Sequence, residues 1–176
     1  MSNMREVSLR RAGSHDAERL FEWRRLDDVD RWMFSDPPTS FDAHVTWLES
    51  QLERTDRWLW IIEVEGNPVG LVTLAASDDP GKLDLGIYVA DAASRGVGML
   101  ALTELLSLAR SQRMGDCVRA DVFADNARAI NLYERIGFVK VAPLLNDRVK
   151  RGVVRAVIRF EKDLGDGKAP SNSGVR

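Results

Sequence analysis

The sequence has few of the residues on which several kinds of site depend. Of its 176 residues, only one is cysteine (Cys117) and only two are histidine (His15 and His44). A single cysteine cannot form an intrachain disulfide, and we expect no metal site from it and the two histidines. Cys117 begins a run, residues 117–123, that alternates like a strand, so we expect an inert thiol in the core.

The sequence also lacks long hydrophobic runs and a strong excess of charge of either sign. No apolar run approaches the roughly 20 residues needed to span a bilayer, and the first five residues contain no apolar signal region. The net charge is -2 at pH 7, which gives no whole-protein attraction to nucleic acid or anionic membranes. We therefore expect a soluble cytoplasmic protein without a nucleic-acid or membrane partner.

The length favours one domain. A chain of 176 residues can bury a sizeable single core, and we find neither an internal repeat nor a second domain. We expect this domain to span residues 1–164. Residues 165–176 are rich in Gly, Pro and Ser and are predicted to form a disordered tail.

Hydrophobic periodicity predicts a mixed α/β (α+β) fold with the order βααβββαβαββ. An antiparallel meander feeds a βαβ unit, giving a mostly antiparallel sheet of about seven strands flanked by about four helices. Residues 27–40, which contain two consecutive prolines, are predicted to be irregular. Strands are expected at 7–12, 57–64, 69–74, 82–89, 118–123, 138–142 and 153–160, and helices at 14–26, 40–52, 98–113 and 126–136.

A glycine-containing turn lies between a predicted strand and a predicted helix, at residues 94–100. Free N–H groups at a helix N-terminus point toward an anion, and the helix dipole favours negative charge there. Gly96 and Gly98 would let the main chain approach a phosphate closely, and Arg95 could add a charge-assisted bond. Two such glycines can equally be structural punctuation.

A second segment, residues 126–138, follows a predicted strand. Asn126 stands where a helix cap is wanted, and Tyr133 lies two turns later on the same face as residues 129–130. The plain interpretations are a cap and a core aromatic. Gly137 and Phe138 are typical of a helix end followed by a core strand residue.

Together the two segments resemble the GNAT superfamily of acyl-CoA N-acetyltransferases, and the resemblance covers about residues 5–163. The first family motif, Arg/Gln-x-x-Gly-x-Gly/Ala, is met by Arg95 and Gly98, with Leu100 in place of the final small residue. The second motif is Asn-x-x-Ala-x-x-x-Tyr-x-x-x-Gly-Phe. It is met in full by Asn126, Ala129, Tyr133, Gly137 and Phe138.

The resemblance implies acetyl-CoA as the cofactor and a role for each motif. The backbone of the strand at 85–89 would bind the pantetheine arm, the glycine turn the pyrophosphate, and Tyr133 would protonate the leaving thiolate. We further expect the Val89 amide to donate to the tetrahedral oxyanion. The implied cofactor-binding residues are Ile87, Tyr88, Val89, Arg95, Gly96, Val97, Gly98, Met99, Leu100, Asn126, Ala129 and Tyr133.

The N-terminal half normally sets the acceptor in this family. Its Trp-Arg pair at 23–24, Arg-x-Trp-Met-aromatic element around 31–34 and His-x-x-Trp at 44–47 resemble the N-acetyltransferases of the pseudaminic acid pathway. That branch acetylates the 4-amino group of a UDP-linked 4-amino-4,6-dideoxy sugar. The implied substrate-binding residues are Arg24, Met33, Phe34, His44, Thr73 and Tyr88.

Several alternatives stay open at this point. His44 could act as a base, since its unperturbed pKa is near neutral, and some of the aromatic residues could simply fill the core. The acceptor could be a polyamine or a protein N-terminus, or the chain could be a non-catalytic CoA-binding module. Exposed sheet edges could support a homodimer.

Overall fold

The computed structural model describes residues 6–90 and 96–165, except for the side chains of residues 142–146. Arg95 and almost all of the predicted tail lie outside the described residues. The helices are η1 (Ser14–Asp16, a 3-10 turn), α1 (Ala17–Arg25), α2 (Asp27–Asp30), α3 (Phe41–Leu52), α4 (Val97–Ser111) and α5 (Ala127–Ile136). The strands are β1 (Val7–Arg11), β2 (Arg57–Val64), β3 (Asn67–Ala76), β4 (Lys82–Val89), β5 (Cys117–Phe123), β6 (Val139–Lys150) and β7 (Val153–Asp163).

These strands form one sheet with the order β1-β2-β3-β4-β5-β7-β6. Every neighbouring pair is antiparallel except β4 and β5, which are parallel and joined through α4. The prediction of a mixed, mostly antiparallel sheet of seven strands is confirmed. Among the described residues, α2 is the one α-helix that the sequence did not predict, a single turn in the stretch expected to be irregular.

The last hairpin is much longer than the sequence predicted. We expected its first strand to end at 142, yet β6 continues to Lys150 and pairs with β7 up to the turn. β6 contains Pro143 and lies at the sheet edge, where a missing backbone donor is tolerated. The turn contains Arg151 (φ 52°) and Gly152 (φ 76°), the left-handed pair of a tight two-residue hairpin turn.

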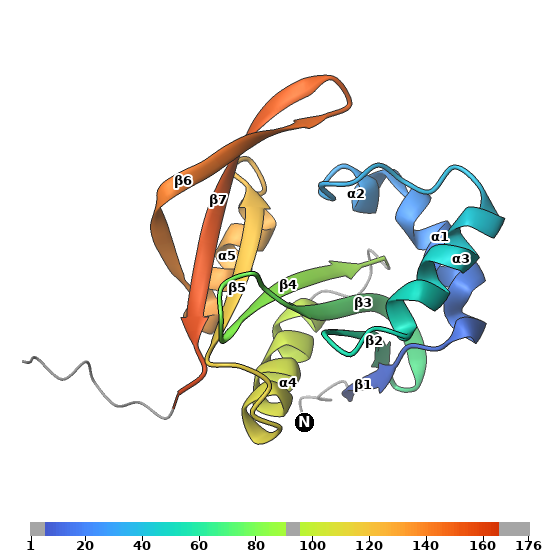
Figure 1. Cartoon of the computed structure of the whole chain (residues 1–176), viewed down its shortest axis with the longest axis horizontal. Coiled ribbons are helices and arrows are strands. Elements are labelled where there is room, and N and C mark those ends of the chain that lie inside the picture. The colour runs from blue at the N-terminus through green and yellow to red at the C-terminus, as the bar shows by residue number, and fades with distance from the viewer. Residues whose placement is uncertain (1–5, 91–95, 166–176) are drawn as a thin grey trace, which may run out of the picture.

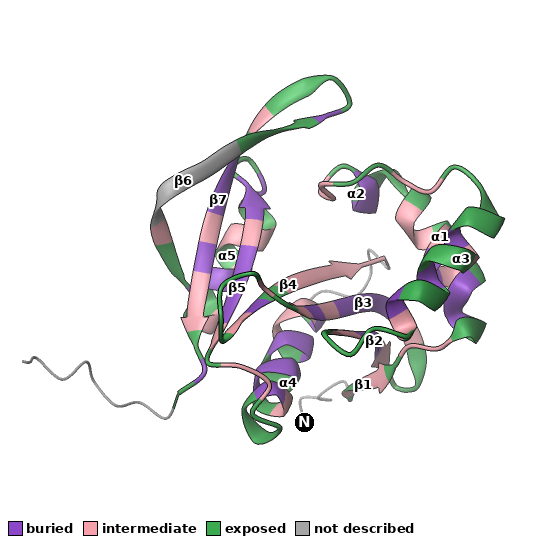
Figure 2. Cartoon of the chain, viewed as in Figure 1, coloured by how far each residue is buried: buried purple, intermediate pink, exposed green. Residues whose placement is uncertain are grey.

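Successive side chains of a strand point to opposite faces of the sheet, and a core lies on each face. Figure 2 shows the buried residues of the central strands and of α4. On one face, α4 and α5 cover a large cluster that includes Val72, Leu102 and Phe160. On the other face, α1 and α3 cover a smaller cluster that includes Leu20 and Leu48. Helices therefore cover both faces of the half of the sheet that contains β2 and β3.

The sheet opens between β4 and β5. Their ladder covers only Lys82–Asp84 against Cys117–Arg119, and beyond it the two strands diverge, as Figure 1 shows. At the far end of the divergent half, the β6–β7 hairpin reaches across toward α2 (Figure 1). Within the described ranges, no helix is both long and apolar enough to cross a membrane.

Candidate active site

A cavity of about 640 Å³ lies where β4 and β5 diverge. It is lined by the second half of β4, the start of α4, the end of β5, one face of α5 and the segment around α2. Its size is typical of a site for a small ligand or cofactor. The predicted site residues at its wall are Met33, Phe34, Ile87, Tyr88, Val89, Gly96, Gly98, Met99, Asn126, Ala129 and Tyr133.

The start of α4 presents backbone donors to this cavity. Gly96 caps the helix with φ 83°, a conformation that suits glycine. Its carbonyl accepts from the amides of Met99 (3.1 Å) and Leu100 (3.4 Å), so the amides of Val97 and Gly98 precede the first intrahelical bonds. A Cβ on Gly98 would approach Leu132 Cδ2 to 3.2 Å, so glycine keeps α4 close to α5.

The other residues of the predicted glycine turn are placed differently. The Val97 side chain is buried in the core, whereas that of Leu100 is 47% exposed and does not line the cavity. A role of either residue in cofactor binding would therefore have to use the backbone, and it stays a prediction.

One edge of β4 is free to bind a ligand. The Ala90 amide donates to Val69 O at 2.8 Å, which makes Val89 and Gly70 a non-hydrogen-bonded pair. The N–H of Val89 therefore points away from β3, toward the gap that β5 leaves, and the alternation gives Ile87 the same orientation. The N–H of Val89 is therefore not used by the β3–β4 ladder, and its role as the donor to the oxyanion stays a prediction.

Asn126 is first of all a helix cap. Its Oδ1 accepts from the Ala129 amide at 3.1 Å, and the side chain is 8% exposed at the cavity wall. At the other end of α5, Gly137 adopts φ 91°, and the Phe138 amide donates to Tyr133 O at 2.9 Å. The motif residues therefore define where the helix begins and ends.

Tyr133 lies at the wall of the cavity and in the core at once. It is 5% exposed, and its ring centroid is 5.4 Å from that of Phe138 and 5.8 Å from that of Phe160. Burial, with a smaller contribution from the Asp121 carboxylate, raises the pKa of Tyr133 above its ordinary value. The phenol is therefore protonated throughout the neutral pH range.

The opposite wall is formed by α2 and the residues after it. Met33 and Phe34 line the cavity together with Trp32, which sequence reasoning had not assigned to the site. The Phe34 ring meets that of Phe123 edge to face at 4.8 Å, and the guanidinium of Arg155 lies 5.0 Å from the Trp32 ring centroid. Aromatic surface thus faces the ligand space on this side.

Two buried donors lie on this side of the molecule, the Tyr88 hydroxyl at the cavity wall and the Arg24 guanidinium outside the cavity lining. Arg24 Nη2 donates to Ser35 and Asp36, but among the described residues its Nη1 has no hydrogen-bond partner, nor does the Tyr88 hydroxyl. Burial lowers the pKa of Arg24 and raises that of Tyr88, and the charge of Arg24 partly opposes the latter shift. Buried donors of this kind usually have a partner, which here a ligand could supply.

Two further predicted substrate residues lie away from the cavity wall. His44 is 4% exposed between α1 and α3, with its ring 5.5 Å from Trp47 and 5.6 Å from Phe21. Desolvation lowers its pKa. Thr73 on β3 pairs with Gly86 on β4, and a Cβ added to Gly86 would be 2.8 Å from Thr73 Oγ1. Gly86 lines the cavity, whereas Thr73 does not.

The structure adds charged residues that the sequence analysis did not single out. Asp28, Asp121, Arg128 and Arg135 line the cavity. Both acids are paired, Asp28 with Arg31 at 3.0 Å and Asp121 with Arg159 through two bonds of 2.7 and 2.8 Å. The seven-residue spacing of Arg128 and Arg135 on one helix could have indicated their common face, whereas the pairing of the acids depends on the tertiary structure.

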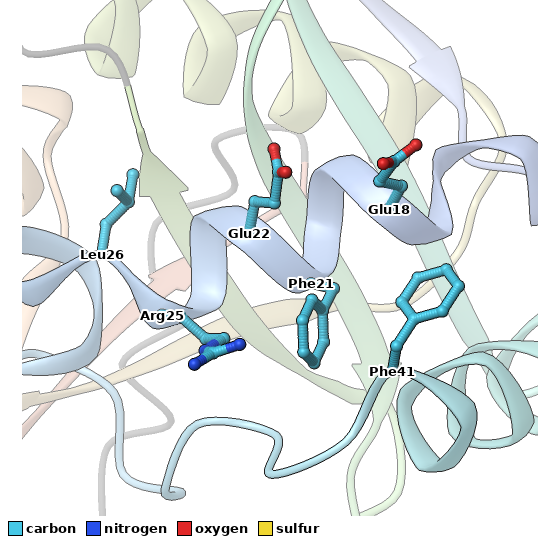
Figure 3. Close-up of a pocket in the computed structure, with 6 residues that line it drawn as sticks. All are labelled: Glu18, Phe21, Glu22, Arg25, Leu26 and Phe41. Atoms are coloured by element: carbon cyan, nitrogen blue, oxygen red, sulfur yellow. The ribbon is translucent and has the colours of Figure 1, made fainter.

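A second hollow of about 430 Å³ lies on the outer side of α1 (Figure 3). Its wall includes Phe21 and Phe41, whose rings meet edge to face at 5.5 Å, and two glutamates, Glu18 and Glu22. It contains none of the motif residues. Across the described part of the chain, no group of three or more His, Cys, Asp or Glu residues could hold a metal ion.

Comparison with known proteins agrees with the fold and with the resemblance found in the sequence. The family model described as an acetyltransferase (GNAT) domain matches residues 6–139. The acetyltransferase PseH of Campylobacter jejuni is 22% identical over 125 residues, which are 71% of this chain and 78% of that protein.

Solved structures share the fold at low sequence identity. The spermidine N-acetyltransferase of Vibrio cholerae in complex with CoA and spermine has a TM-score of 0.82 at 18% identity, covering 90% of this chain and 95% of that one. An aminoglycoside acetyltransferase in complex with coenzyme A has a TM-score of 0.70 at 21% identity, covering 88% and 94%. A Salmonella typhimurium acetyltransferase that modifies the N-terminal serine of a ribosomal protein has a TM-score of 0.78 at 12% identity, covering 89% and 94%.

Proposed function

Because the chain belongs to the GNAT acetyltransferase family, we propose that it acetylates the primary amine of a compound that also carries anionic or hydrogen-bond-accepting groups. The chain is an acyltransferase that uses acetyl-CoA. Our preferred acceptor is the 4-amino group of a UDP-linked 4-amino-4,6-dideoxy sugar. The observation that carries this preference is the pair of buried donors, Arg24 Nη1 and the Tyr88 hydroxyl.

The residues around the cavity suit acetyl-CoA. Free amides at the start of α4 can bind the pyrophosphate, and the unpaired edge of β4 can bind the pantetheine amides. Bound acetyl-CoA supplies a thioester, whose carbonyl carbon is attacked by the neutral amine of the acceptor.

The protein's own groups then handle the charges that develop. The Val89 amide donates a hydrogen bond to the carbonyl oxygen as it becomes negative. The C–N bond forms and the C–S bond breaks, while Tyr133 gives its phenolic proton to the sulfur. The surplus proton of the amine leaves to water, and the Tyr133 phenolate takes a proton back from water. The products are the N-acetylated amine and CoA.

The charges on the acceptor side favour an acceptor that is not a polycation. The two carboxylates that line the cavity, Asp28 and Asp121, are each paired with an arginine. Arg24 adds a buried positive charge with a free donor. Anionic oxygens and hydroxyls would satisfy these donors, whereas a polyamine would bring further positive charge toward them.

A polyamine remains the second candidate because of the fold similarity to spermidine N-acetyltransferase. At 18% identity this similarity concerns the fold, and the paired acids argue against it on electrostatic grounds. A protein N-terminus is the third candidate, by the same kind of similarity.

The test is release of free CoA thiol from acetyl-CoA in the presence of three kinds of amine. We expect turnover with UDP-linked 4-amino-4,6-dideoxy sugars, and little with spermidine or with peptides that have a free N-terminal serine. In Arg24→Met, the KM for the sugar nucleotide should rise while that for acetyl-CoA stays unchanged. Turnover of spermidine alone would overturn the proposed acceptor.

A further inference from the structure

The aromatic side of the cavity is held by a distant part of the chain. We call residues 27–36, which include α2, the acceptor wall. At one end Arg24 bonds to Ser35 and Asp36. The other strong contacts come from the tip of the β6–β7 hairpin, more than a hundred residues later, which Figure 1 shows reaching toward α2.

A buried ion pair is at the centre of this contact. Lys150 Nζ lies 2.7 Å from Asp30 Oδ1, and both side chains are only 2% exposed. Lys150 also donates to Ser35 O at 2.9 Å. One ammonium group therefore binds the helical part of the wall and the residues beyond it together.

The next residues of the hairpin reinforce the contact. Arg151 donates to Asp30 Oδ2 through Nε at 3.0 Å and through Nη2 at 2.6 Å. Arg155 donates to Arg31 O at 2.7 Å, and Arg148 lies 5.3 Å from the Phe34 ring centroid. Asp30 thus accepts from two cations, and the aromatic residues that face the cavity are covered from behind.

A buried pair of this kind is a poor way to gain stability. Removing two charges from water costs about as much as their attraction returns, and apolar residues of similar volume often do as well or better. The ion pair does restrict where the acceptor wall can lie relative to the hairpin. A short ion pair is kept in only a few relative positions of its two groups, whereas an apolar contact is kept in many. The acceptor wall must be placed accurately, because small errors in the position of a reacting group slow catalysis strongly.

We propose that Lys150, through its ion pair with Asp30, is a positioning residue that fixes the acceptor wall against β4 and β5 and so sets which amines are accepted. The proposal rests on the proposed function only for its kinetic readout. Lys150 itself is not proposed to contact acetyl-CoA or the acceptor. It acts through the placement of Met33 and Phe34.

Two variants separate positioning from simple stability. Lys150→Met leaves Asp30 buried without its ammonium partner and should lower Tm. Asp30→Leu combined with Lys150→Met removes both charges at similar volume and should restore Tm. Lys82→Met is the matched control, because Lys82 forms an ion pair of the same length, 2.7 Å with Glu161, away from the wall.

The kinetic measurement uses acetyl-CoA with whichever of the sugar nucleotide, spermidine or serine peptide the unmodified chain acetylates. In both Lys150→Met and the double variant, we expect the KM for the amine to rise about tenfold or more. The KM for acetyl-CoA should stay within about twofold. A double variant that recovers both Tm and the amine KM would overturn the proposal, as would equal changes in the two KM values.

A second measurement needs no acceptor. Hydrogen–deuterium exchange should show faster uptake at the amides of residues 27–36 in both variants, while the amides of α1 and α3 keep their original rates. In the Lys82→Met control, residues 27–36 should also keep their original rates. Unchanged deuterium uptake at the acceptor wall would overturn the positioning role of Lys150. If the unmodified chain acetylates none of the three amines, the proposed acceptor fails and the exchange result alone decides the role of Lys150.

Discussion

Tyr133 illustrates how one side chain can serve both the core and the chemistry. Its ring packs on Phe138 and Phe160, and burial raises the pKa of its phenol, so the general acid that we propose is protonated at neutral pH. In Tyr133→Phe the packing is kept and the proton is lost. We expect kcat to fall about 100-fold or more, as for the loss of a general acid, with Tm nearly unchanged.

The chain offers a matched control, since Tyr88 is the other of its two tyrosines. Tyr88→Phe also removes one buried hydroxyl, but from the acceptor side, so it should raise the KM for the amine and leave kcat close to its original value. Steady-state kinetics of the two variants make the comparison. Near-normal kcat in Tyr133→Phe would rule out the general-acid role.

His44 predicts a pH dependence of stability. In the unfolded chain its pKa is near 6.5, and in the folded chain desolvation lowers it. Below about pH 6.5 the unfolded chain therefore binds the proton more readily, so stability is retained above this pH and lost as the pH falls toward the lowered pKa. Tm should drop between pH 7.5 and 5.5, and His44→Leu should make this drop smaller.

The exposed His15 serves as the control, because its side chain is 72% exposed. His15→Gln should show the same drop in Tm as the unmodified chain in thermal melts at the two pH values. An equal drop in His44→Leu would mean that carboxylates, and not this imidazole, cause the pH dependence.

At the scale of elements, the motif of α5 has a structural role beside the chemical one that we propose. Asn126→Ala removes the bond to the Ala129 amide and should lower the free energy of unfolding by about 1 kcal/mol. Asn126→Asp keeps a capping oxygen and should retain the stability. If the Asn126 amide also donates to CoA, Asp should still weaken CoA binding about tenfold, because it replaces a donor with a negative charge.

Urea unfolding and calorimetric titration with CoA distinguish the two roles of Asn126. If Asn126→Asp binds CoA as tightly as the unmodified chain does, Asn126 acts only as a helix cap.

The elements themselves differ in how well their sequences predict them. Both ends of α5 could be located because Asn126 and Gly137 are strong local signals. The start of β6 was predicted, but its extension to Lys150 was not, because a strand that contains Pro143 is acceptable only at a sheet edge. The sequence does not show which strand forms that edge. α2 is a single turn held by contacts with the distant hairpin, so local periodicity carries little trace of it.

At the scale of the whole molecule, the site exists because two halves of the sheet separate. The α1 and α3 layer covers one half, the hairpin extends from the other, and the cavity lies between them. The Asp30–Lys150 pair joins the two sides. A change at the hairpin tip can therefore alter the site without touching the motif residues.

The sequence by itself determined the fold class and the family, and it predicted which residues bind the cofactor. Those features depend on local patterns within short stretches of sequence, such as strand alternation, helix caps and the spacing of Asn126 and Tyr133. Only the tertiary structure decided the surroundings of the residues that we propose for the acceptor. Whether Asp121 is free or paired, whether His44 faces a cavity or a core, and what holds residues 27–36 depend on side chains that meet only after the sheet has closed.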